Sequence, residues 1–119
     1  YIALEAVLQL EKKDAKEIRE YMNELREKRT TKQPLEYASA GSTFKRPEGH
    51  FAGQLIEQAG LRGFRVGDAQ VSEKHCGFLI NRGNATAEDV VELMREVTVK
   101  VEEKFGVTLE PEVKKLGEF

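Results

Sequence analysis

The chain has 119 residues, of which 39% are hydrophobic and 34% are charged, and its net charge is −2. This length and composition predict a soluble globular domain that buries a real core. The charge lacks the basic excess of nucleic-acid-binding proteins, and no apolar run approaches the roughly 20 residues that span a bilayer. We therefore expect neither nucleic acid nor a membrane as a partner. A single cysteine excludes an internal disulfide and suits the reducing cytoplasm.

The chain begins inside an alternating pattern, in which the apolar residues from Ile2 to Leu10 occupy every second position. Period two predicts a strand with one face on a core. Because this pattern starts without an initiator methionine, we expect the chain to be a piece of a longer protein.

A helix is predicted from Asp14, whose carboxylate can cap free N–H groups, with Glu17 completing a box-like arrangement. The apolar stripe of this helix consists of Ile18, Tyr21, Met22 and Leu25. We expect the helix to fade near Arg29 and residues 32–37 to form a connector.

Residues 38–53 gather hydrogen-bonding side chains on a backbone interrupted by three glycines and Pro47. This combination predicts an irregular binding loop. The Gly-x-Ser-x-Gly elbow of hydrolases is absent, so Ser42 is not predicted to be a nucleophile of that type. It fits either a structural serine that bonds its own backbone or a hydroxyl that serves a ligand. Lys45 and Arg46 fit either surface cations or a cradle for phosphate or carboxylate, without the pattern of a P-loop.

The middle of the chain predicts a short helix just after His50, stopped by Gly60 and Leu61. Strands are predicted at 65–71 and 77–80, the second of them as a continuous apolar run covered on both faces. Polar turns are expected between and after these strands, at 72–75 and 81–84.

Thr86 and Asp89 cap the most regular helix of the sequence. Its apolar residues share one face, and these are Val90, Met94, Val97, Val101 and Phe105. Gly106 ends this helix, and the following extended segment, 107–113, is interrupted by Pro111 and predicts an edge or irregular strand. The elements predict a single compact α+β domain over 1–119, with a small mixed or antiparallel sheet packed by two longer helices and one short helix.

Several side chains outside the loop could carry chemistry. His50, His75 and Cys76 lack the spacing of a zinc site, so we predict no metal, and Cys76 is expected to pack as a small apolar residue. His75 fits a turn residue or a ligand donor equally well. Glu110 and Glu112 fit surface carboxylates, or acids if they are buried.

Five motifs occur in order along almost the whole chain. They are Ala-Gly-Ser-Thr-Phe-Lys-Arg-Pro (40–47), Ala-Gly-Gln-Leu-Ile-Glu (52–57), Leu-Arg-Gly-Phe-Arg-Val-Gly-Asp-Ala-Gln-Val-Ser-Glu-Lys-His (61–75), Asn-Arg-Gly-Asn-Ala-Thr (81–86) and Leu-Glu-Pro-Glu-Val (109–113). Together they resemble the C-terminal, substrate-binding domain of the UDP-N-acetylenolpyruvoylglucosamine reductase family, flavoenzymes of peptidoglycan precursor synthesis.

The resemblance implies a bacterial cytoplasmic enzyme that converts UDP-N-acetylglucosamine enolpyruvate to UDP-N-acetylmuramate. In this family, FAD is bound mainly by N-terminal domains, is reduced by NADPH and passes hydride to C3 of the enolpyruvyl group. Ser42 matches the serine that protonates C2. Glu112 matches the glutamate that, with an arginine of the flavin domain, stabilises the enolate-like intermediate.

The resemblance also implies substrate contacts for Arg46 and for His75, at which relatives often carry Gln, and the cation Lys45 beside them suits an anionic UDP-sugar. The flavin-binding domains are the implied partners, and without them the chain is expected to be inactive. The sequence resembles the shorter-loop branch of the family. It departs from the family pattern at Lys114, where Arg is usual and the bidentate fork is lost, and at Asp68, where Gly is frequent.

Two other functions stay open at this point. The chain could be a stand-alone nucleotide-sugar-binding module without chemistry, or a folded structural unit whose 38–53 loop is disordered by itself. Ligand titration of the chain tests the first alternative, and amide exchange across the loop tests the second.

Overall fold

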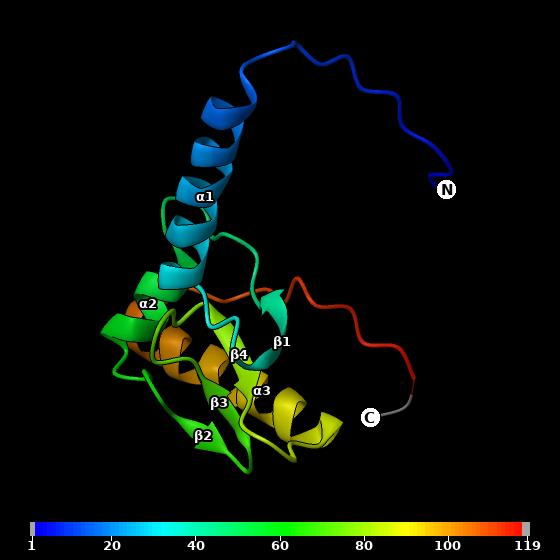
Figure 1. Ribbon diagram of the computed structural model, residues 1–119. Helices are drawn as coiled ribbons and strands as arrows, with labels where there is room; N and C mark the ends of the chain where they lie inside the picture. Colours follow the sequence, from blue (N-terminus) through cyan, green and yellow to red (C-terminus); the bar gives the residue numbers. More distant parts are fainter. Residues whose placement is uncertain (1, 118–119) are drawn as a thin grey trace. The chain divides into compact units, whose positions relative to one another are not determined.

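Four antiparallel strands, in the order β1-β4-β3-β2, form a sheet (Figure 1). The structure is a computed structural model, and it describes residues 2–117. Its strands are β1 (Ala38–Ser42), β2 (Arg65–Val66), β3 (Ala69–Val71) and β4 (Phe78–Asn81). The central strand β4 buries three consecutive residues, which confirms the prediction of a strand covered on both faces.

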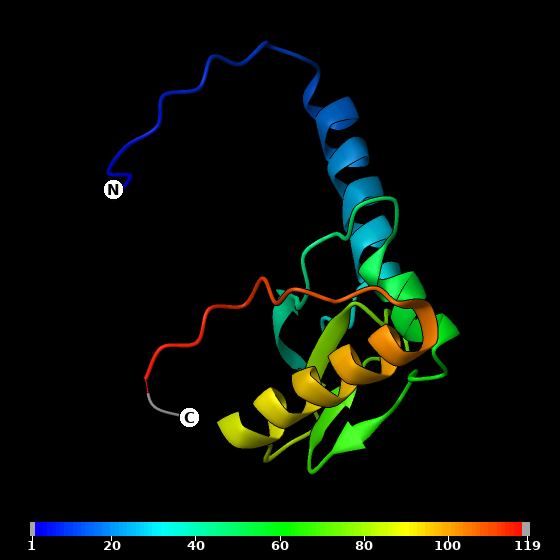
Figure 2. The same ribbon diagram turned by 180° about the vertical axis from the view of Figure 1, so that it is seen from behind.

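The described residues form three helices: α1 (Ala15–Lys32), α2 (Ala52–Gln58) and α3 (Ala87–Phe105). The helix α3 packs against β2, β3 and α2, and Figure 2 shows it lying in front of the sheet. The predicted α+β class is confirmed, with two longer helices, one short helix and an antiparallel sheet. Among the described helices, none has both the length and the apolar character needed to cross a membrane.

The core lies where α3 and α2 meet the sheet. Its members from these elements include Leu55, Ile56, Ala69, Val71, Leu79, Leu93, Met94, Val97 and Val101. The predicted capping box begins α3, because Thr86 Oγ1 accepts the N–H of Asp89 and the Asp89 carboxylate accepts the N–H of Thr86. Gly106, in the left-handed conformation, ends the helix as predicted.

The predicted stop after α2 is also confirmed. The N–H of Gly60 donates to the carbonyl of Glu57, and the N–H of Leu61 donates to the carbonyl of Ile56. Gly60 has a positive φ of 78°, and Leu61 is buried. These are the two hydrogen bonds and the apolar contact of a Schellman motif.

The chain divides into two units, the first ending at Thr31 and the second beginning at Lys32. In the first unit Asp14 Oδ1 accepts two backbone N–H groups and starts α1 as predicted, although α1 continues past the predicted end near Arg29. The predicted strand over residues 2–10 is wrong, because this segment has no regular structure and its apolar side chains are exposed. An alternating segment becomes a strand only when a neighbour takes up its backbone hydrogen bonds, and none of the described strands pairs with it.

Two further predictions are corrected in the second unit. Residues 38–42 form the strand β1, paired with β4, and not the start of an irregular loop; their small side chains carry no apolar alternation that would have indicated a strand. The single strand predicted over 65–71 is a hairpin, in which β2 and β3 pair around Gly67 and Asp68. Gly67 has a positive φ of 54°, a conformation that tight hairpin turns require and that glycine adopts readily.

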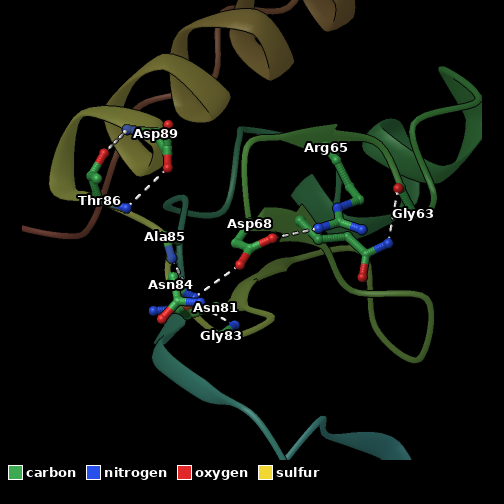
Figure 3. Close-up of polar contacts among 10 residues, drawn as sticks. Gly63, Arg65, Asp68, Asn81, Gly83, Asn84, Ala85, Thr86 and Asp89 are labelled. Atoms are coloured by element: carbon green, nitrogen blue, oxygen red, sulfur yellow. Dashed lines mark hydrogen bonds and ion pairs between the residues drawn. The ribbon is translucent and has the colours of Figure 1, made fainter.

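The Asp68 carboxylate ties this hairpin turn to the loop between β4 and α3 (Figure 3). Its Oδ1 accepts from Arg65 Nη2 at 2.7 Å, and its Oδ2 accepts the backbone N–H of Asn84 at 2.9 Å. Asn81 Oδ1 accepts two further N–H groups of the same loop. The hairpin and the segment that leads into α3 are therefore held by polar contacts as well as by the core.

Candidate functional site

A cavity of about 580 Å³ in the second unit has Ser42 and Glu112 in its lining. Both residues are exposed, and both also border a smaller hollow of about 290 Å³. Arg46 and His75 line the larger cavity too. The structure therefore brings together four of the five predicted site residues, which lie far apart in the sequence.

One extra residue in β1 sets the direction of Ser42. Ser39 pairs with Ile80 and Ser42 pairs with Phe78, so three steps along β1 match two steps along β4. This is a β-bulge, a feature that redirects side chains and is frequent beside active sites. Gly41 occupies the bulge with a positive φ of 87°, which other residues adopt only with strain.

Thr43 connects the end of β1 to the C-terminal segment. Its N–H donates to the carbonyl of Gly77 at 2.9 Å, and its buried Oγ1 accepts the N–H of Leu79 at 3.1 Å. The Thr43 carbonyl accepts the N–H of Glu112 at 2.9 Å. Main-chain hydrogen bonds thus hold Glu112 beside the residue that follows Ser42.

The segment 107–113 is irregular, as predicted, and makes one isolated bridge between Phe44 and Pro111. Leu109 anchors it in the core with 2% exposure. Lys45 donates its backbone N–H to the Glu110 carbonyl at 2.8 Å, and its ammonium group pairs with the Glu110 carboxylate. Lys45 is not among the residues that line the cavity, so its visible role is to secure this segment.

His75 is held in the cavity wall by its own loop. Its N–H donates to Ser72 Oγ at 3.2 Å, and its Nδ1 accepts the N–H of Gly77 at 3.1 Å. Its ring packs edge-on against Phe78, with ring centroids 5.0 Å apart. Because Nδ1 acts as an acceptor, a neutral His75 carries its proton on Nε2 and can donate it to a ligand.

Two of the three Arg and Lys side chains in the lining already have carboxylate partners. Arg62 donates to the Glu57 carboxylate at 2.5 Å and to the carbonyl of Glu73. Lys74 Nζ lies 3.5 Å from the Glu36 carboxylate. The charges of these two cations are therefore largely compensated within the chain.

Arg46 differs from the other two. Its guanidinium group lies over the Phe51 ring, 4.0 Å from the ring centroid, and no carboxylate among the described residues pairs with it. A guanidinium group without a carboxylate partner can form a bidentate contact with a phosphate or carboxylate. Arg46 is thus the cation of this cavity best suited to an anionic ligand.

Cys76 lies in the same wall and belongs to the apolar core, as predicted. Burial raises the pKa of its thiol, and the nearby Arg62 lowers that pKa to a smaller extent. A thiol with a raised pKa forms little thiolate, the reactive species. Within residues 2–117, no group of three or more His, Cys, Asp or Glu side chains is arranged to hold a metal ion.

Some lining residues did not emerge from the sequence as site residues. These are Phe51, Gln54, Glu57, Arg62 and Lys74. The sequence places them in an ordinary short helix and in turns, so only their proximity to the predicted loop could have indicated them.

Comparisons with known proteins agree with the motifs. The family model described as UDP-N-acetylenolpyruvoylglucosamine reductase, C-terminal domain, matches residues 33–116. The reductase of that name from Agathobacter rectalis is 64% identical over 119 residues, which cover 100% of this chain and 38% of the relative. The one from Clostridium tetani is 56% identical over 118 residues, covering 99% of this chain and 38% of the relative.

A solved structure is similar as well. The UDP-N-acetylenolpyruvylglucosamine reductase from Thermus caldophilus matches with a TM-score of 0.69 and 41% sequence identity, over 88% of this chain and 37% of that chain. This chain therefore spans well under half the length of the relatives that it matches.

Proposed function

This chain belongs to the UDP-N-acetylenolpyruvoylglucosamine reductase family, and from that premise we propose that it binds substrate and donates the proton in such a reductase. The reaction converts UDP-N-acetylglucosamine enolpyruvate to UDP-N-acetylmuramate for peptidoglycan synthesis in the bacterial cytoplasm. The observation that carries the proposal is that Ser42 and Glu112 border one cavity.

We assign FAD and NADPH to the rest of the reductase. The chain has no Gly-x-Gly-x-x-G sequence, the pattern that holds a dinucleotide phosphate at a helix N-terminus. The N-terminus of α3 is closed by its own capping box. When bound, the flavin supplies hydride to C3 of the enolpyruvyl group, and the residues of this chain act on the substrate alone.

Ser42 is the proposed proton donor to C2. A serine hydroxyl is too weak an acid to protonate the resting substrate, but it is adequate against the strongly basic carbon of an enolate. Its exposure at the cavity border lets it reach a ligand, while the neighbouring Thr43 keeps the strand end fixed.

The other lining residues are assigned to binding and charge stabilisation. The Glu112 carboxylate orients the arginine of the flavin domain, and together they stabilise the enolate-like charge. The Arg46 guanidinium group binds an anionic group of the substrate through two N–H donors, and His75 donates a hydrogen bond to the substrate from Nε2. Lys45 is a proposed substrate contact only if its ammonium group leaves the Glu110 carboxylate and pairs with the ligand instead.

The assignment of Ser42 is tested in a chimeric reductase, in which this chain replaces the matching part of the Agathobacter rectalis enzyme. We expect Ser42→Ala to leave reduction of FAD by NADPH unchanged and to slow flavin reoxidation by substrate about 10²- to 10⁴-fold, measured by stopped-flow absorbance. Thr108→Ala, which removes an exposed hydroxyl outside the cavity lining, is the control. Wild-type rates in both half-reactions would refute the assignment.

A second pair of variants tests Glu112. Glu112→Gln is expected to lower turnover with little change in substrate affinity, since the carboxyl group acts on the intermediate and not on the bound ground state. Glu103→Gln, at an exposed position of α3 outside the lining, should retain turnover. A change confined to affinity would make Glu112 a binding residue.

The flavin-binding domains are the partners that this proposal requires. Exposed apolar side chains on α1 and on residues 2–10 support such a partner, because the apolar stripe of a helix usually faces an element that covers it. The competing function is a nucleotide-sugar-binding module without chemistry, which the uncompensated Arg46 favours. Calorimetric titration of the 119-residue chain with UDP-N-acetylmuramate separates the two: binding as tight as that of the chimeric reductase would favour the module.

A further inference from the structure

We propose that Phe51 is a positioning residue, which holds the Arg46 guanidinium group ready to bind an oxyanion of the substrate. This inference rests on the proposed function, and it adds a residue that neither the motifs nor the comparisons assign to the site. Both side chains line the cavity, and the guanidinium carbon lies 4.0 Å from the ring centroid.

The position of Phe51 in its own helix does not explain its presence. It occupies the N-cap of α2 with extended backbone angles (φ −116°, ψ 124°) and makes no side-chain capping bond. Ser, Thr, Asp and Asn are favoured at that position because their side chains satisfy free N–H groups. A phenyl ring cannot, so α2 begins with an unfavourable residue.

Burial does not explain Phe51 either. Its side chain is 57% exposed, whereas the neighbouring Ala52 is 7% exposed. A ring exposed to this extent removes little apolar surface from water. The contact with Arg46 is the one aromatic or cation–π interaction of Phe51 in the described structure.

A local turn brings the two residues together. The N–H of His50 donates to the carbonyl of Pro47 at 3.2 Å, and this turn reverses the chain between Arg46 and Phe51. The backbone of one short segment therefore brings the two side chains together.

The chemical value of the ring is clear from the contrast with Arg62. A carboxylate, Glu57, fixes Arg62 and compensates its charge. A ring face fixes a guanidinium group by a cation–π contact while leaving the positive charge and the N–H edge available. Arg46 is thereby oriented without losing its capacity for a bidentate contact with phosphate or carboxylate.

The test uses Phe51→Leu, which keeps an apolar side chain and removes the π face, in the chimeric reductase. Calorimetry with UDP-N-acetylmuramate should show a Kd about 2- to 5-fold higher than wild type, and KM should rise with kcat unchanged. Phe51→Trp should restore the affinity to within about twofold, since Trp offers a larger π face. A thermal melt should match wild type because the ring is largely exposed.

A double-mutant cycle separates this role from a simple apolar contact. In an Arg46→Ala background, Phe51→Leu should have no further effect on Kd, because the ring then has nothing to position. Tyr37→Leu is the matched control, since Tyr37 lies under Arg82 in the same type of contact but is absent from the lining, and it should leave Kd unchanged. Independent, additive effects of Phe51→Leu and Arg46→Ala would overturn the inference.

The oxyanion is identified by repeating the titration with UDP-N-acetylglucosamine, which carries the diphosphate but no carboxylate. Equal weakening with both ligands assigns Arg46 to the diphosphate, and weakening with UDP-N-acetylmuramate alone assigns it to the carboxylate. An unchanged Kd for both ligands refutes the inference. That failure is distinct from failure of the proposed function, which is decided by the half-reactions of Ser42→Ala.

Discussion

Residues 2–31 and residues 32–117 both carry periodic apolar patterns, but the patterns have opposite outcomes. All residues of α1 that belong to the first unit, 15–31, are exposed, and Leu25 is 46% exposed. In α3, Leu93, Val97 and Val101 are all 0% exposed. Helical periodicity therefore indicates which face is apolar, whereas burial depends on whether another element is present to cover that face.

The largest expected difference is in stability, when a leucine of α3 and a leucine of α1 are each replaced by alanine. Leu93→Ala should lower the free energy of unfolding of the chain by about 2 to 5 kcal/mol, because it leaves a cavity in a closed core. Leu25→Ala should change it by no more than about 0.5 kcal/mol, as for other surface positions. Urea unfolding followed by circular dichroism measures both changes. A similar cost for the two variants would show that α1 is packed in solution.

A smaller effect is expected at the two helix starts. Thr86→Ala removes one half of the capping box of α3 and should cost about 1 kcal/mol of unfolding free energy. Asp14→Ala removes the cap of α1, whose residues are exposed, so it should lower helical content without moving the main unfolding transition. A shift of that transition by Asp14→Ala would mean that α1 and the second unit unfold together.

The smallest perturbation uses the two native methionines and needs no substitution. Met22 in α1 is 63% exposed and Met94 in α3 is 6% exposed, so dilute hydrogen peroxide should oxidise Met22 first, as peptide mass spectrometry would show. Equal rates in the folded chain would contradict the burial difference, and equal rates in urea are the control. Protection of Met22 in the chimeric reductase would support a partner over α1.

Elements marked by local signals were predictable from the sequence. The capping box at Thr86, the glycine stop at Gly60 and the apolar run of β4 depend only on neighbouring residues, and each is confirmed. The strand predicted over residues 2–10 failed because pairing depends on a distant segment. The strand β1 is not indicated by the sequence, because its small residues carry no apolar alternation. Only its pairing with the distant strand β4 makes this segment a strand.

The site was predictable only through the resemblance to a family. Ser42, Arg46, His75 and Glu112 each had an ordinary structural interpretation, and no spacing rule joins a β-bulge to a C-terminal segment. The cavity that they share results from tertiary pairing. The sequence pattern indicates Phe51 only as the first apolar residue of a short helix, because its contact with Arg46 depends on a turn whose geometry the sequence does not specify.

The bridge between the end of β1 and the C-terminal segment has a consequence for protein engineering. Backbone atoms of Thr43 and Glu112 make the connection, so a substitution at either position leaves this hydrogen bond's donor and acceptor in place. Val113, on the rim of the smaller hollow, can therefore be replaced by side chains of other sizes while the donor and acceptor of this hydrogen bond are kept.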